Sequence, residues 1–207
     1  MEITRKAQTG RPREFDTDQA LDQAVLLFWR QGYEGTSLSD LENAMGITRK
    51  SVYAAFGNKE ELFRKALQRY SEGPAAYGLE SLRQPTAREV ATAFLNGSVE
   101  TSTRPGGPAG CLGVAAALTV GAANQPIQDA LRTWRDGGQA ALRERFQRAI
   151  DERDLPANAD AGSIAQYVMT VSNGIAVQAL GGATRDELHR VAVAALKTWP
   201  PACSGPA

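Results

Sequence analysis

Histidine and cysteine are scarce in this chain of 207 residues. His189 is its single histidine, and its two cysteines, Cys111 and Cys203, lie far apart in the sequence. These residues are too few for a histidine-rich metal site, a metal cluster or a disulfide framework. A hydrolase needs a base beside its nucleophile, and Cys111 has only one imidazole in the chain to serve it. We therefore expect no metal, no cofactor and no enzymatic activity.

The motifs of nucleotide-binding and metal-dependent enzymes are missing as well. The sequence contains no P-loop, no GxGxxG and no HExxH. Gly106-Gly107 lies between prolines, where we expect a loop. No apolar run approaches the roughly 18 residues that a membrane span needs, and the N-terminus lacks the apolar run of a signal peptide. These absences predict a cytoplasmic protein without a membrane partner.

An excess of charge of either sign is also absent. The 23 basic and 23 acidic residues give a formal net charge of zero, so the chain has no global basic field of the kind many nucleic-acid binders show. Basic residues nevertheless crowd the N-terminal arm, residues 1–15: Arg5, Lys6, Arg11 and Arg13. So polar a segment cannot bury enough apolar surface to fold alone. Contact with DNA and a plain disordered tail remain equal alternatives for this arm.

Residues 36–63 predict two short helices joined by a tight turn, followed by the start of a third. Apolar residues recur on one face of the first helix, at Leu38, Leu41 and Met45. Gly46 is suited to end that helix because glycine reaches positive φ without a Cβ penalty. Thr48 is a good N-cap for a second helix over residues 49–55. The pattern predicts a helix-turn-helix whose second helix is the recognition helix.

The expected recognition helix has two different sides. Val52 and Phe56 share an apolar side, and the other side carries Arg49, Lys50 and Tyr53. DNA offers phosphates, which need cations and hydroxyl donors, and base edges in the major groove. This face favours DNA binding over the alternative of an ordinary helical hairpin with a solvated basic surface.

This block resembles the DNA-binding domain of the TetR family of bacterial transcription regulators. The matching motifs are Gly35-Thr36, Gly46-Ile47-Thr48, Tyr53-Ala54-Ala55-Phe56 and Lys59-Glu60-Glu61-Leu62. Glu42 and Lys50 depart from the family pattern, which has small residues at both positions. The resemblance implies an all-α fold, with an N-terminal three-helix DNA-binding domain over residues 16–71 and a C-terminal helical ligand-binding and dimerisation domain over residues 72–207.

The resemblance also implies which residues meet DNA. Lys59 would contact phosphate at the edge of the domain, with a merely solvated lysine as the alternative. The full set of expected DNA-binding residues is Thr36, Thr48, Arg49, Lys50, Ser51, Tyr53 and Lys59.

The remainder of the chain predicts helices separated by breaks. Capping signatures open helices at four positions: Asp16 with Gln19, Asn58 with Glu61, Thr86 with Glu89, and Thr184 with Glu187. Residues 75–85 are expected to form a loop or a ragged helix end, and residues 104–108 a break. Further helices are expected over residues 126–150, 160–180 and 184–199.

The last two expected helices carry apolar faces. These faces either join two subunits in a four-helix bundle or complete the core of one chain. The TetR family uses its last two long helices for dimerisation, which favours a homodimer. The expected interface residues are Val168, Val171, Ile175, Leu188, Val191 and Ala195.

A small-molecule site inside the C-terminal domain is the other expectation that the resemblance carries. The candidate lining residues are Phe94, Cys111, Leu131, Trp134, Tyr167 and Met169, each with a plain core position as its alternative. Cys111 follows Gly110 at an expected helix start, where the helix dipole lowers a thiol's pKa. That position permits a redox or electrophile sensor, and an inert buried thiol is the alternative.

The leading interpretation is a homodimeric, ligand-responsive repressor. Its N-terminal domains would sit in successive major grooves of a palindromic operator, and a small-molecule effector would release it. The alternative is a helical module that regulates a protein partner without reading DNA, favoured only by Lys50 and the neutral net charge.

Overall fold

The computed structural model describes residues 15–201, so the basic residues of the N-terminal arm and Cys203 lie outside the described part of the chain. Within that part the fold is all-α, as expected. The elements are α1 (Thr17–Gln31), α2 (Leu38–Met45), α3 (Arg49–Phe56), α4 (Lys59–Glu72), α5 (Tyr77–Ser81), α6 (Ala87–Ser102), α7 (Leu112–Thr119), the 3-10 turn η1 (Ala122–Asn124), α8 (Gln125–Asp151), α9 (Ala161–Leu180) and α10 (Arg185–Ala195). None of these helices is both long and apolar enough to cross a membrane.

The predicted helix starts are confirmed by their caps. Asp16 accepts hydrogen bonds from the backbone amides of Asp18 and Gln19. Reciprocal capping boxes open α4, α6 and α10 at Asn58, Thr86 and Thr184. Each box satisfies amides that the first helical turn leaves without a partner.

The structure differs from two expectations about helix extent. A separate short helix, α5, forms where we expected a loop or a ragged helix end, and its Tyr77 packs edge-on against Phe94 with ring centroids 5.6 Å apart. The last helix ends at Ala195 instead of residue 199. Pro200 follows Trp199 and has no backbone N–H, so it cannot continue the hydrogen bonds of a helix at this end of the chain.

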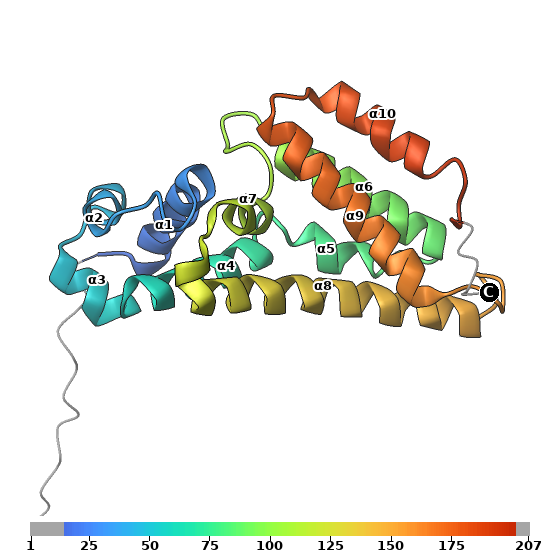
Figure 1. The fold of residues 1–207 in the computed structure, drawn as a ribbon, viewed down its shortest axis with the longest axis horizontal. Coiled ribbons are helices and arrows are strands. Elements are labelled where there is room, and N and C mark those ends of the chain that lie inside the picture. The colour runs from blue at the N-terminus through green and yellow to red at the C-terminus, as the bar shows by residue number, and fades with distance from the viewer. Residues whose placement is uncertain (1–14, 202–207) are drawn as a thin grey trace, which may run out of the picture.

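The molecule is elongated, with α8 running along most of its length (Figure 1). The helix-turn-helix of α2 and α3 lies at one end, held by α1 and α4. At the other end, α9 packs against α6, α8 and α10. The short helix α7 lies between these groups and contacts α1, α4, α8 and α9.

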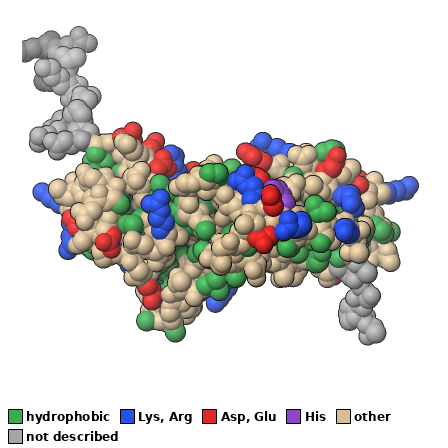
Figure 2. Space-filling view, turned by 90° about the horizontal axis from the view of Figure 1, so that it is seen from above, with side chains coloured by type: hydrophobic (Ala, Val, Ile, Leu, Met, Phe, Trp, Pro, Cys, Tyr) green, Lys and Arg blue, Asp and Glu red, His purple; other side chains and the backbone are tan. Residues whose placement is uncertain are grey.

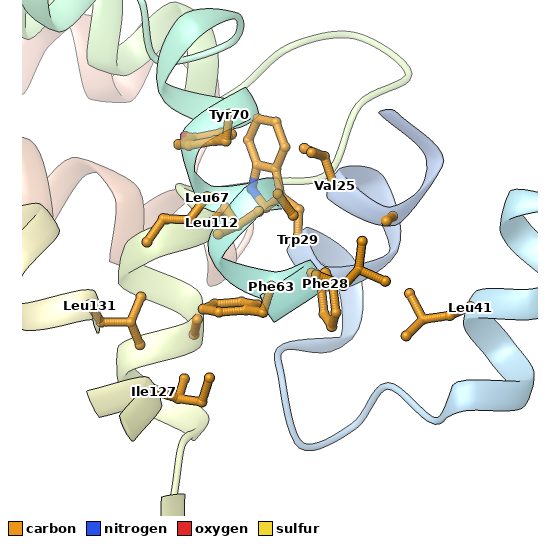
Figure 3. Close-up of a cluster of buried hydrophobic side chains, with 14 of the residues drawn as sticks. Val25, Phe28, Trp29, Leu41, Phe63, Leu67, Tyr70, Leu112, Ile127 and Leu131 are labelled. Atoms are coloured by element: carbon orange, nitrogen blue, oxygen red, sulfur yellow. The ribbon is translucent and has the colours of Figure 1, made fainter. Parts of the chain in front are cut away.

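The core of the N-terminal helices continues into the second half of the chain (Figure 3). Phe28 of α1 meets Phe63 of α4 edge-on at 5.1 Å. Leu112 of α7 with Ile127 and Leu131 of α8 complete the same cluster. A second core joins α6, α8, α9 and α10. The helix-turn-helix therefore shares buried surface with the helices that follow residue 71.

Candidate nucleic-acid interface and ligand cavity

The outer face of α3 is exposed and polar. Val52 and Phe56 are buried against the core, whereas Arg49, Lys50 and Tyr53 point outward. Lys50 forms no hydrogen bond or ion pair with any described residue, so its ammonium group is available to an external partner. The sequence pattern thus identified the two sides of this helix correctly.

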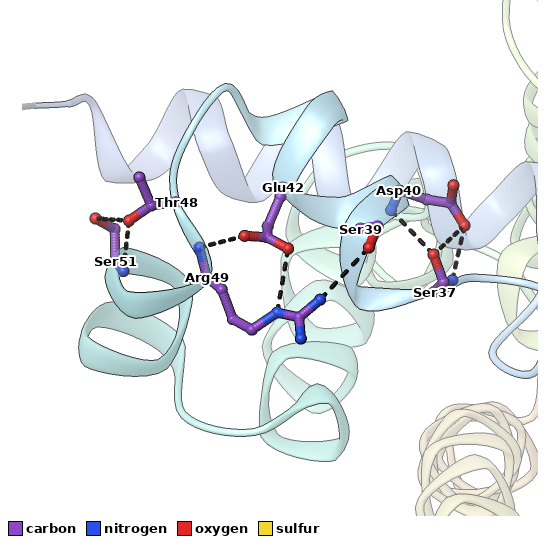
Figure 4. Close-up of polar contacts among 7 residues, drawn as sticks. All are labelled: Ser37, Ser39, Asp40, Glu42, Thr48, Arg49 and Ser51. Atoms are coloured by element: carbon purple, nitrogen blue, oxygen red, sulfur yellow. Dashed lines mark hydrogen bonds and ion pairs between the residues drawn. The ribbon is translucent and has the colours of Figure 1, made fainter.

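Two hydroxyls mark the start of α3. Thr48 is the N-cap, and its Oγ1 accepts a hydrogen bond from the backbone amide of Ser51 at 3.3 Å. The two side-chain oxygens also lie 3.1 Å apart (Figure 4). Thr48 is exposed and Ser51 is half-buried. Both expected contact residues are therefore fixed beside the positive end of the helix dipole.

Glu42 binds Arg49 from the neighbouring helix. Its carboxylate accepts hydrogen bonds from the backbone amide of Arg49 at 2.5 Å and from Nε at 3.2 Å (Figure 4). The Arg49 guanidinium also donates to Ser39 Oγ at 3.4 Å. Glu42, which departs from the family pattern, thus caps α3 with a negative charge and holds one of its two N-terminal cations.

Thr36, which we expected among the DNA-binding residues, does not fit that role. Its side chain is fully buried, and its hydroxyl donates to the carbonyl of Gly32 at 2.7 Å. A buried hydroxyl bound to the backbone cannot reach DNA. Thr36 instead fastens the turn between α1 and α2.

Lys59 lies at the first position of α4. Its Nζ is 4.3 Å from the centroid of the Tyr33 ring, and burial lowers the pKa of Lys59 from its usual value. Lys65, which the sequence did not single out, donates to the carbonyl of Phe56 at 3.0 Å. It stabilises the C-terminal end of α3, where cations favour the exposed carbonyls.

A cavity of about 250 Å³ lies where α4–α9 meet. Its walls are mostly apolar, and four expected residues line it: Phe94, Cys111, Trp134 and Met169. Leu131 and Tyr167, which we also expected in the wall, do not line the cavity. Leu131 belongs to the first core, and the Tyr167 hydroxyl donates to the carbonyl of Ala195 at 2.8 Å.

The thiol and one phenol of the cavity wall have raised pKa values. Burial raises the pKa of the Cys111 thiol, and burial beside Cys111 raises the pKa of Tyr77 to about 12. The helix-start position had suggested a lowered thiol pKa, and this expectation is wrong because desolvation outweighs the dipole. The buried inert thiol, the alternative reading, fits this environment better. No group of three or more His, Cys, Asp and Glu side chains between residues 15 and 201 is placed to hold a metal ion.

Two tryptophans connect the cavity region to the N-terminal helices. Trp134 lines the cavity, and its Nε1 donates to Ser71 Oγ of α4 at 2.7 Å. Trp29 of α1 donates from Nε1 to the carbonyl of Gly110 at 3.2 Å, just before the cavity-lining Cys111. The cavity wall is therefore hydrogen-bonded to α4, and the residue before Cys111 is hydrogen-bonded to α1.

A third connection lies outside the core. Glu34, in the turn before α2, accepts hydrogen bonds from the backbone amide of Gly121 and from Nδ2 of Asn124, both at 2.7 Å. These two donors, the Gly121 amide foremost, lower the pKa of Glu34. We call this contact the Glu34 clasp. It fixes the helix-turn-helix to the connection between α7 and α8.

Half of the expected dimer interface faces inward. Val168, Ile175 and Leu188 lie in the second core of the chain itself, so they are core residues and not the surface contacts that we expected. Val171 and Ala195 are partly buried against the same core. Val191 is exposed, as are three further apolar residues of α9 and α10: Val177, Leu180 and Val193. Figure 2 shows apolar side chains among charged ones on the α10 side of the molecule.

Family models match both halves of the chain. The model described as bacterial regulatory proteins, tetR family, matches residues 20–66. A tetracyclin repressor-like C-terminal domain matches residues 88–195. The first match covers α2, α3 and the exposed face described above, and the second covers much of the cavity wall.

Known proteins resemble the chain over nearly its whole length. It is 30% identical over 197 residues to the HTH-type transcriptional repressor ComR of Escherichia coli (strain K12), covering 94% of each protein. It is 25% identical over 186 residues to the repressor BdcR of the same strain, covering 90% of each. A cysteine mutant of the regulator CifR, solved with 26-bp double-stranded operator DNA, is 42% identical with a TM-score of 0.87, over 92% of this chain and 100% of that chain. These likenesses favour DNA reading over the alternative of a helical module that does not read DNA.

Proposed function

The chain belongs to the tetR family of bacterial regulatory proteins, and we propose that it is a homodimeric repressor that leaves its operator when a small molecule fills the cavity. As a family member it is a DNA-binding transcriptional regulator, a class of protein that is not enzymatic. The DNA-binding part of this proposal rests on one observation, the exposed outer face of α3. Its basic and hydroxyl side chains are outward while its apolar side chains are buried.

The DNA-binding unit extends over residues 16–71. Lys50 and Tyr53 project from α3, and Arg49 beside them forms an ion pair with Glu42. Lys50 and Arg49 are close enough to the helix N-terminus to reach base edges, whereas Lys59 and Tyr53 contact the phosphate backbone. Thr48 and Ser51 supply further hydroxyls at the same helix end.

In this proposal the two subunits meet through α9 and α10. Their exposed apolar residues would lose contact with water in a dimer, and removing apolar surface from water favours association. The residues proposed for this surface are Val177, Leu180, Val191 and Val193. Two subunits joined there would present two copies of α3 to successive major grooves of a palindrome.

Release requires that the effector bind one arrangement of the protein better than another. The cavity reaches α4 through the Trp134–Ser71 hydrogen bond and lies beside the Gly110 carbonyl that Trp29 binds. A ligand that displaces Trp134 would therefore shift α4 relative to α8. Because α4 packs on α1 within the shared core, the spacing of the two recognition helices would change.

A mobility-shift series on promoter DNA tests the proposal. We expect binding to the operator by two chains, with affinity that falls as salt rises because phosphate contacts release counterions. Candidate small molecules should lower operator affinity in proportion to their occupancy of the cavity. A chain that binds operator and scrambled DNA equally, or binds neither, would contradict the proposal.

A further inference from the structure

The rim of the cavity carries one uncompensated positive charge. Arg135 of α8 lines the cavity and is half-buried, yet it forms no hydrogen bond or ion pair with any described residue. Its neighbour on the same helix, Arg132, is paired with Asp129 at 3.3 Å. The lining includes no aspartate or glutamate among the described residues. The cavity therefore presents a free guanidinium and nothing to neutralise it.

A second uncommitted polar group faces the same cavity. Asn173 of α9 is a lining residue, and its side-chain amide has no hydrogen-bond partner in the described chain. Helices α8 and α9 pack side by side, joined by a hydrogen bond between Gln139 and Gln166 at 2.7 Å. Two donors on facing helices are thus left for a ligand that can accept hydrogen bonds.

Two glycines follow Arg135 closely on α8. Gly137 and Gly138 line the cavity within α8, and a Cβ added at either would meet no atom within 4 Å. Glycine inside a helix is less stable than alanine by about 1 kcal/mol per residue. The pair therefore leaves bare helix surface next to the free cation.

The rest of the lining favours an apolar tail. Phe94, Trp134, Met169 and Val114 form much of the wall. An engineered apolar cavity of about 150 Å³ holds benzene, so the observed volume of about 250 Å³ suits one aromatic ring with a short chain or a medium-length alkyl chain. A cationic ligand would be repelled by Arg135 and would find no carboxylate in the lining.

We propose that the effector is a small amphipathic carboxylic acid. Its ring or alkyl chain fills the apolar part of the cavity, and its carboxylate accepts hydrogen bonds from Arg135 and Asn173. Arginine suits this task because its planar guanidinium binds a carboxylate through two parallel hydrogen bonds. The inference rests on the proposed effector cavity and names the chemistry of its ligand.

The test compares acids with amides of the same shape. Octanoate and phenylpropanoate are titrated against octanamide and phenylpropanamide, with binding followed by tryptophan fluorescence and by release of operator DNA. We expect each acid to bind at least about tenfold more tightly than its amide, since charge-assisted hydrogen bonds are about twice as strong as neutral ones. Arg135→Gln should reduce acid affinity to the level of the amide and leave amide affinity unchanged.

Arg132→Gln is the matched control, because it removes the same charge from the same helix outside the cavity lining. It should leave the preference for acids intact. Equal affinity for acid and amide, an unchanged preference in Arg135→Gln, or no binding of either acid would overturn the proposed ligand class. The proposed regulation would fail by a different result, namely a ligand of any charge that occupies the cavity without changing operator affinity.

Discussion

At the scale of single residues, the most consequential pair is Glu42 and Arg49. Two of the cations on the outer face of α3 are adjacent in sequence, but only Arg49 is bound by a carboxylate, with Nε 3.2 Å from the Glu42 oxygen. The same carboxylate accepts from the Arg49 backbone amide, one of the donors that a helix start leaves unsatisfied. Glu42 therefore stabilises the start of α3 and reduces the positive charge on its outer face.

Glu42→Ala should separate these two effects. Loss of the cap should lower the free energy of unfolding by about 1 kcal/mol, measured by denaturant titration. Release of Arg49 should strengthen binding to every DNA sequence at low salt and steepen the salt dependence by about one counterion per subunit. Glu60→Ala is the control, since Glu60 pairs with Arg64 and not with α3. An unchanged salt slope in Glu42→Ala would mean that Arg49 remains held by other groups.

At the scale of elements, local chemistry predicted helix starts well and connections between helices poorly. The capping boxes at Asn58, Thr86 and Thr184 depend on residues three apart, so a sequence suffices to find them. The bond between Trp29 and Gly110 joins residues far apart in the chain, and no local pattern indicates it. Glu34 likewise has no sequence signature, because its partners are a backbone amide and an asparagine across the molecule.

The Glu34 clasp should make stability depend on pH. The pKa of the Glu34 carboxyl is lower in the folded chain than in the unfolded chain. Between these two pKa values the unfolded chain binds more protons, so the free energy of unfolding rises with pH in that range. The contribution should be complete at neutral pH and should disappear as pH falls through the folded pKa of Glu34. Unfolding of the parent and of Glu34→Ala, measured from neutral to acidic pH, should converge at the acid end. Glu144→Ala is the control, because it removes an exposed carboxylate of α8 without a described partner. Its free energy of unfolding should follow pH in parallel with that of the parent. The same parallel course for Glu34→Ala would refute the clasp.

At the scale of the whole molecule, the shared core and the exposed faces decide what a second subunit can contact. Periodicity identified the apolar stripes of α9 and α10 correctly, but it could not say which stripe the chain itself would cover. Val168 and Leu188 are covered by α6, α9 and α10 packing together, whereas Val177 and Val193 remain exposed. The cavity shows the same limit, since Leu131 and Trp134 are nearly equivalent by sequence and only Trp134 lines it.

Charge substitutions on α9 should distinguish an interface from a core. Val177→Glu places a carboxylate on a surface that is exposed in one chain, so we expect a folded monomer by sedimentation and circular dichroism. Val171→Glu buries charge against the second core and should reduce stability by several kcal/mol. Leu118→Glu, a change at a more exposed apolar residue on α7, should stay dimeric. A stable dimer of Val177→Glu would remove this part of α9 from the interface.

We propose that the outer face of α3 reads operator bases, whereas the start of α4 contacts phosphate alone. The decisive measurement is the affinity of Lys50→Ala and Lys59→Ala for operator and scrambled DNA at several salt concentrations, with Arg49→Ala alongside. Lys50→Ala should reduce the operator-to-scrambled ratio by roughly tenfold, since a base contact contributes about 1–3 kcal/mol of discrimination. Lys59→Ala should keep that ratio and flatten the salt slope by about one counterion per subunit. An unchanged ratio in both Lys50→Ala and Arg49→Ala would contradict base reading by these two residues of α3 and place it elsewhere in the chain.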